Sequence, residues 1–223
     1  MGVGHAAVAL ASARFAPRVN AGILVFAAFL ADFLLGIFAL AGLEQAHVPA
    51  NYESAHYLTF TFPYSHGLVP LLLWGMIFGA IVAIAQTKGR GAAFFICAGL
   101  VVSHFLLDGI VHVAGLPVLG NSPPKFGLGL WRNMPLELGL ETLLTFIGVA
   151  IYLVFIGQRA PRLARYGIPI FMVILTLLTW TQLFLNTPPQ DSELIFSWIA
   201  MPVFFAAIPW VLDRKRIARS SRG

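Results

Sequence analysis

Six long apolar stretches divide the chain, and each approaches the roughly 20 residues that a helix needs to cross a ~30 Å hydrocarbon core. They cover 19–43, 66–86, 91–116, 136–157, 168–186 and 193–212. Hydrophobic residues make up 59% of the chain and charged residues only 10%, too few to cover a soluble protein of this size. The sequence therefore predicts an all-α integral membrane protein with about six transmembrane helices.

The basic residues predict how these helices are oriented. All Lys and Arg residues except Lys125 and Arg132 lie before the first stretch, after the second, after the fourth or after the last. Because cytoplasmic loops of membrane proteins are enriched in Lys and Arg, we expect a cytoplasmic C-terminus and periplasmic loops at 44–65 and 117–135. The expected location is the bacterial inner membrane. Basic residues spread over several loops do not form the single patch typical of nucleic-acid binding, so we expect no nucleic-acid partner.

Ionisable side chains inside the apolar stretches are the most informative feature. A charged residue at the bilayer centre is costly, and such residues usually face the bundle interior and mark a functional site. The stretches contain no Lys or Arg, so the partners of their carboxylates must be protons, imidazoles or metal ions. The ionisable residues in this set are Asp32, His66, His104, Asp108, His112, Glu137 and Glu141.

The spacing of these residues predicts that they converge. His104, Asp108 and His112 follow one another at intervals of four residues, so they share one face of a helix, and Glu137 and Glu141 do the same on the next stretch. Imidazole nitrogens mixed with carboxylate oxygens suit zinc, iron(II) or manganese. The single cysteine, Cys97, excludes a cysteine-based zinc or iron–sulfur site. We therefore expect a metal site near the outer ends of these helices.

Other roles for the same residues stay open at this point. Intramembrane carboxylates and imidazoles also build proton or ion pathways, so a proton-coupled transporter or channel is one alternative. A haem protein with His66 and His104 as axial ligands and a di-iron membrane oxidase are others. A purely structural role is a further alternative. His47 and His56 lie in the outer loop and are expected to be solvated surface residues.

Residues 1–135 carry an ordered series of short motifs. These are Met-Gly-Val-Gly-His ending at His5, Leu-Ala-Asp ending at Asp32, Tyr-Ser-His-Gly around His66, and Ser-His-Phe-Leu-Leu-Asp from Ser103 to Asp108. In this order the chain resembles the bacterial inner-membrane family described as predicted membrane-bound metal-dependent hydrolases. Relatives in that family often have a second Asp and a His where this chain has Phe33 and Leu34, and a further His at Thr61, so fewer metal ions are expected here.

The same order is similar to the helical fold of zinc-dependent phospholipase C and S1/P1 nuclease, whose ligand series ends in His-x3-Glu; Glu137 and Glu141 match that spacing with Glu in place of His. The likeness implies metal-assisted hydrolysis of a phosphoester or lipid-type substrate at the outer membrane face. It implies Glu137 as general base and Asp108 as a catalytic residue. The implied metal ligands are His5, Asp32, His66, His104, Asp108, His112 and Glu141, with zinc as the expected metal. Lys125 and Arg132, the outer cations, are expected to bind substrate phosphate or lipid headgroups.

The N-terminal segment raises a topological problem, since a cytoplasmic N-terminus would place His5 far from an outward-facing site. Residues 3–15 are mostly apolar but span only about 20 Å as a helix, too short to cross the membrane. We therefore expect a re-entrant half-helix that brings His5 to the depth of Asp32. The whole chain is expected to form one membrane domain, with the metal-site helices within 1–157 and two scaffold helices and a basic tail within 158–223.

Overall fold

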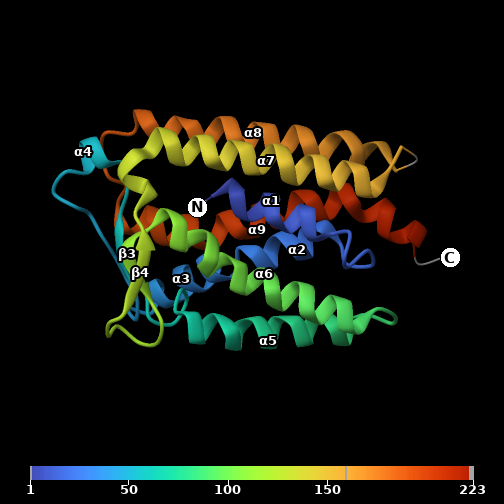
Figure 1. The fold of residues 1–223 in the computed structure, drawn as a ribbon, viewed down its shortest axis with the longest axis horizontal. Helices are drawn as coiled ribbons and strands as arrows, with labels where there is room; N and C mark the ends of the chain where they lie inside the picture. The colour runs from blue at the N-terminus through green and yellow to red at the C-terminus, as the bar shows by residue number, and fades with distance from the viewer. Residues whose placement is uncertain (1, 159, 221–223) are drawn as a thin grey trace.

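The computed structural model describes residues 2–158 and 160–220, and these residues form a bundle of long, roughly aligned helices (Figure 1). The long helices are α5 (Leu68–Ala85), α6 (Arg90–Val111), α7 (Met134–Ile156), α8 (Ile168–Trp180) and α9 (Asp191–Ser220). Short helical turns extend α7 and α8: η1 (Leu130–Asn133), η2 (Leu163–Gly167) and η3 (Thr181–Phe184). Within the described residues, five helices are long and apolar enough to cross a membrane, which confirms the predominantly helical prediction.

The first apolar stretch differs from the single helix that its composition predicts. It forms α2 (Ala21–Ala28) and α3 (Leu30–Leu40), which meet at Phe29 with a bend of 53°. Counted as one broken span, this pair brings the apolar helices to six. Phe29 has dihedral angles outside the helical region, and its ring packs against those of His5 and Phe205. The bend at Phe29 therefore coincides with ring contacts to α1 and α9.

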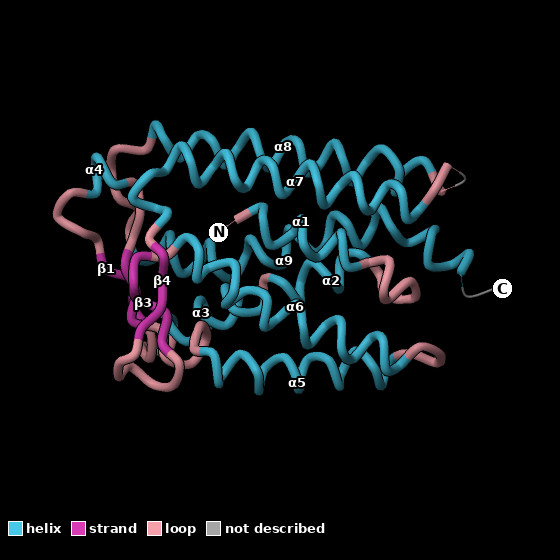
Figure 2. Tube along the Cα trace, in the orientation of Figure 1, coloured by secondary structure: helices cyan, strands magenta, loops and turns pink. Residues whose placement is uncertain are grey.

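The outer loops contain strands that the all-α prediction did not include. β1 (Gln45–His47) pairs antiparallel with β2 (Thr59–Thr61), and α4 (Tyr52–Ala55) lies between them. β3 (Val113–Pro117) pairs antiparallel with β4 (Lys125–Leu128), so the third apolar stretch leaves the helix after Val111 rather than at residue 116. Both ribbons lie at the same end of the bundle (Figure 2). We call this the loop end.

The opposite end of the bundle collects the basic residues. The turns at 13–20 and 86–89, residues 157–158 and 160–162, and the described end of α9 lie together there (Figure 1). Arg216 donates to the carbonyls of Pro17 and Val19 and pairs with the fully buried Asp213 at 2.6 Å. Asp213 also accepts from the Tyr152 hydroxyl and the Ala21 amide, which joins α9 to α7 and to the start of α2. We call this the basic end; Lys125 and Arg132 are in the loop end.

Helix α1 (Val3–Ser12) is short, apolar and buried inside the bundle, with its first residues near the middle of the molecule (Figure 1). It packs against α7 at Gly148, where an added Cβ would lie 2.7 Å from the Ala7 carbonyl carbon. Glycine allows similarly close packing of α5 on α6, where a Cβ at Gly79 would lie 2.7 Å from the Phe94 carbonyl oxygen. The close α1–α7 contact positions His5.

Candidate metal centre

Four parts of the fold bring imidazole and carboxylate groups together inside the bundle. His5 comes from α1, Asp32 from the first turn of α3, His66 from the turn before α5, and His104 and Asp108 from successive turns of α6. All of these side chains are buried except that of Asp32, which is 26% exposed. Residues as many as 103 positions apart in the sequence therefore form one cluster, as the sequence predicted.

The distances between the polar atoms are short. The Nε2 atoms of His66 and His104 are 3.2 Å apart. The Oδ1 atom of Asp32 lies 3.6 Å from His66 Nε2 and 3.8 Å from His104 Nε2. The Oδ2 atom of Asp108 lies 3.3 Å from His104 Nε2 and 3.8 Å from His66 Nε2. These atoms therefore lie close together between α3, α6 and the turn before α5.

The bend in the first apolar stretch fixes the orientation of His104. The Nδ1 atom of His104 is 2.7 Å from the Ala28 carbonyl oxygen, at the last residue of α2. A carbonyl only accepts, so Nδ1 donates, and in a neutral ring Nε2 then carries a lone pair. In metal-binding histidines, the ring nitrogen that does not bind the metal usually donates a hydrogen bond of this kind.

His66 is held by a neighbouring hydroxyl and, indirectly, by a buried carboxylate. Ser65 Oγ lies 2.7 Å from His66 Nδ1. The backbone amides of Tyr64 and Ser65 donate to Glu44 Oε1 at 2.7 and 2.9 Å, and Glu44 is only 1% exposed. Glu44, in the loop that follows α3, therefore holds the turn that contains His66 in place.

His5 lies directly against the cluster. Its ring stacks on that of His104, with the ring centroids 3.9 Å apart and the planes nearly parallel. Its Nε2 atom is 3.1 Å from Asp108 Oδ1, whereas its buried Nδ1 atom has no hydrogen-bond partner within the described residues. The structure therefore brings His5 to the cluster, as the re-entrant arrangement requires; Met1 lies outside the described residues.

The donor set and its spacing fit a divalent ion. Because the His104 Nε2 lone pair faces carboxylate oxygens and a second imidazole, the arrangement favours a metal ion or a proton between these atoms. For metal–ligand distances near 2.1 Å, tetrahedral ligands are about 3.4 Å apart. The five distances among Asp32, His66, His104 and Asp108 fall around that value, between 3.2 and 3.8 Å. Two overlapping groups could hold an ion: Asp32–His66–His104 and His5–His104–Asp108.

His112 reaches the cluster by a different route from the expected helical stripe. It ends α6 in an extended conformation, and its amide still bonds to the Asp108 carbonyl. Its Nε2 atom is 3.1 Å from Asp108 Oδ2, and its ring centroid is 4.0 Å from that of Trp131. His112 therefore contacts a carboxylate of the cluster and also belongs to the wall facing the loops.

Glu137 and Glu141 lie beside the cluster on α7. Both are 2% exposed. One oxygen of Glu141 accepts from the Gly2 amide, and the other has no hydrogen-bond partner within the described residues. Neither glutamate belongs to the two groups that could hold an ion. Of the expected ligands, Glu141 and His112 therefore lie outside both groups.

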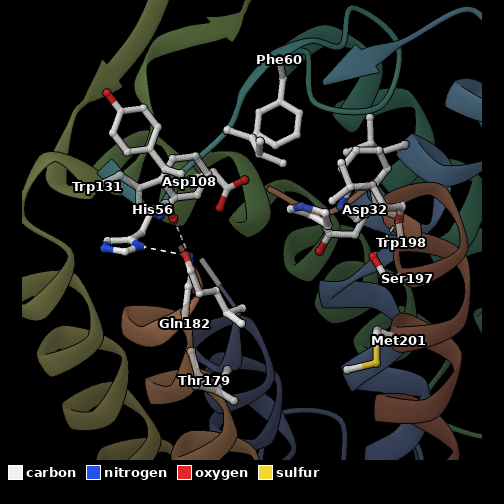
Figure 3. A pocket seen from close by; sticks show the side chains of 18 of the residues that line it. Asp32, His56, Phe60, Asp108, Trp131, Thr179, Gln182, Ser197, Trp198 and Met201 are labelled. Carbon is white, nitrogen blue, oxygen red and sulfur yellow. Dashed lines mark hydrogen bonds between the residues drawn. The ribbon is translucent and has the colours of Figure 1, made fainter. Parts of the chain in front are cut away.

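A cavity of about 800 Å³ connects this cluster to the loop end. Asp32, His66, Asp108, His112, Glu137 and Glu141 all line it. Figure 3 shows Thr179 and Gln182 of the α8–η3 segment on one side, and Ser197, Trp198 and Met201 of α9 across from them. His56, expected on the solvated surface, lines the outer part of this cavity, where its Nδ1 atom lies 3.1 Å from the Leu185 carbonyl oxygen.

Lys125 and Arg132 do not line the cavity. Lys125 lies in β4 and Arg132 in η1, and both side chains are exposed at the loop end. In this conformation the structure does not bring these expected phosphate-binding cations to the cluster.

Several groups that support the site were not expected from the sequence. The Ala28 carbonyl and Glu44 help to orient the histidines, and Trp131 packs on His112. These contacts depend on how distant segments pack. Ser65, which lies against His66 Nδ1, was visible in the sequence as part of the Tyr-Ser-His-Gly motif.

No family model matches the chain, and neither the curated proteins nor the solved structures show a significant match.

Proposed function

We propose that this protein is a membrane-embedded, metal-dependent hydrolase that uses zinc, or alternatively iron(II) or manganese. The observation that carries the proposal is the spacing of four ligand atoms from Asp32, His66, His104 and Asp108, beside an open cavity that Asp32, His66 and Asp108 line. Mixed imidazole and carboxylate ligands on an accessible ion are typical of catalytic rather than structural metal sites. The resemblance to membrane-bound metal-dependent hydrolases points the same way.

The proposed setting is the bacterial inner membrane. Five apolar helices and the bent α2–α3 pair would form six spans, and α1 would be a re-entrant helix in the interior. The basic end would face the cytoplasm, because Lys and Arg concentrate there. The loop end and the mouth of the cavity would then face the periplasm.

The chain's own residues supply the remaining parts of a hydrolytic site. A divalent ion would activate water and polarise the substrate's ester group. Asp108 holds His5, His104 and His112 together through its two carboxylate oxygens. Glu137 lines the same cavity and is the proposed general base, taking the proton from the attacking water. The expected substrate is a phosphoester or a lipid-type ester.

The shape of the cavity favours hydrolysis over transport. Its lining comes from the loop end and the adjoining halves of the helices, and extends along α8 only to Leu175 and along α9 to Phe205. The buried network around Asp213 lies beyond it at the basic end. A cavity whose lining stops short of the basic end suits a substrate that enters and leaves without crossing the membrane.

Hydrolysis of bis(4-nitrophenyl) phosphate by detergent-purified protein tests this function. Activity should be lost on chelation, return with zinc or manganese, and fall by at least about 100-fold in Asp108→Asn. The matched control is His47→Gln, because His47 lies in β1 outside the cavity lining. Chelator-resistant activity, or full activity in Asp108→Asn, would contradict the proposal, and a Soret band in the purified protein would favour a haem protein instead.

A further inference from the structure

The cavity has an apolar wall that the hydrolytic chemistry does not explain. Beyond the cluster its lining continues along α8 through Leu175 and Leu178, and along α9 through Met201, Pro202 and Phe205. These residues belong to two of the helices that are long and apolar enough to cross a membrane. A polar cluster joined to an apolar groove matches an amphiphilic ligand rather than a wholly water-soluble one.

The groove also opens at the side of the bundle. Leu178, Leu185 and Met201 line the cavity, yet they are 59%, 53% and 42% exposed. Residues that line the cavity and are this exposed place part of its wall at the molecular surface. Leu178 belongs to α8 and Met201 to α9, so this part of the wall lies between these two helices; Figure 3 shows Met201 of α9 across from Thr179 of α8. In the proposed membrane setting this side faces lipid.

The length of the groove agrees with one lipid leaflet. Its lining on α9 runs from Glu193, near the loop end, to Phe205. Twelve helical steps correspond to about 18 Å. Half of the hydrocarbon core is about 15 Å, the depth that one acyl chain covers. Glu193 lies at the loop end of this path, and Asp32, His66 and Asp108 line the same cavity.

We propose that the gap between α8 and α9 admits an acyl chain of a membrane lipid, so that its headgroup ester reaches the His/Asp cluster. The substrate class is then a phospholipid or lipid phosphate, and its identity as a substrate rests on the hydrolase function proposed above. Hydrolysis of the headgroup phosphoester consumes one water: the hydroxyl bonds to phosphorus, and the proton goes to the departing alcohol oxygen. Entry of the chain itself needs no metal.

Photocrosslinking in vesicles tests the groove. The protein is reconstituted into phosphatidylethanolamine–phosphatidylglycerol vesicles doped with a phosphatidylglycerol that carries a diazirine at the end of one acyl chain. Mass spectrometry then locates the label. Leu175 is the diagnostic residue, because it lines the cavity but is only 4% exposed, so an acyl chain outside the bundle cannot reach it. Leu178→Trp and Met201→Trp should reduce labelling there by at least about fivefold, since the indole fills the opening.

The matched control is Leu177→Trp. Leu177 is 65% exposed on the same helix and does not line the cavity, so labelling of Leu175 should be unchanged. Labelling confined to outward-facing residues such as Leu177, or equal loss in all three variants, would overturn the proposal. The hydrolase function is tested separately: Asp108→Asn should keep labelling and lose hydrolysis. Labelling of Leu175 without any hydrolysis would support the lipid groove and contradict the hydrolase function. Hydrolysis of soluble phosphoesters without labelling of Leu175 would support the hydrolase function and contradict the lipid groove.

Discussion

Replacing Gly148 by alanine tests whether α1 is docked on α7 as the structure shows. The new Cβ would lie 2.7 Å from the Ala7 carbonyl carbon and 2.9 Å from its Cα. Carbon atoms in contact are about 3.5–4.0 Å apart, so α1 must move by about 1 Å. Such overpacking costs about 1–3 kcal/mol. For a chain of this size, that lowers the melting temperature by about 2–12 °C.

The displacement should also affect the cluster, because His5 lies two residues from Ala7. A shift of about 1 Å would lengthen the 3.1 Å contact between His5 Nε2 and Asp108 Oδ1 beyond hydrogen-bond range. Gly148→Ala should therefore show both a lower melting temperature and weaker metal binding. Thermal unfolding in detergent and metal analysis by mass spectrometry measure the two effects.

Gly139→Ala is the matched control for this substitution. Gly139 lies on the same helix, but no described atom is within 4 Å of an added Cβ. Alanine there should stabilise the protein by about 0.5–1 kcal/mol, because glycine is a poor helix former, and metal binding should not change. If Gly148→Ala behaves like Gly139→Ala, the close α1–α7 contact does not exist and the placement of His5 is wrong.

Three further predictions concern other parts of the structure. Ser65→Ala removes the hydroxyl beside His66 Nδ1 and should weaken metal binding about 10–100-fold with little change in stability, as isothermal titration of the stripped protein would show; unchanged affinity would exclude Ser65 as an orienting group. Asp213→Asn leaves a mostly buried guanidinium without its partner and should destabilise the protein by about 3–5 kcal/mol in chemical unfolding while metal content stays constant. In intact cells, a membrane-impermeant thiol reagent should label Asn121→Cys but not Lys88→Cys, because the loop end is proposed to be periplasmic; the reverse pattern would invert the topology.

Hydropathy alone predicted most of the helices. A long apolar segment in a membrane has to satisfy its backbone hydrogen bonds without water, and an α-helix does this within the segment. Hydropathy could not predict the bend at Phe29. No proline or glycine marks that position, and the bend depends on packing against His5 and Phe205 from distant segments. Hydropathy also extended the third helix through His112, where pairing between β3 and β4 takes over.

The clustering of the site residues was predictable for a different reason. Ionisable residues in apolar stretches must meet one another, so the sequence alone is enough to group His104, Asp108 and Asp32. The groups that orient them could not be predicted in this way. The Ala28 carbonyl is available to His104 only because the helix bends there, and Glu44 reaches the turn at Ser65 only through the loop fold. Backbone carbonyls and loop carboxylates carry no distinguishing sequence pattern.

The central claim is that the His/Asp cluster binds a divalent ion, and X-ray absorption spectroscopy of the purified protein tests it most directly. The account predicts bound zinc, iron or manganese at about one ion or more per chain, with a first shell of nitrogen and oxygen ligands near 2.0–2.2 Å that includes imidazole. His104→Gln should remove that signal, and His47→Gln should leave it intact. Protein that contains no divalent metal after purification and takes up none when zinc is added would contradict the account.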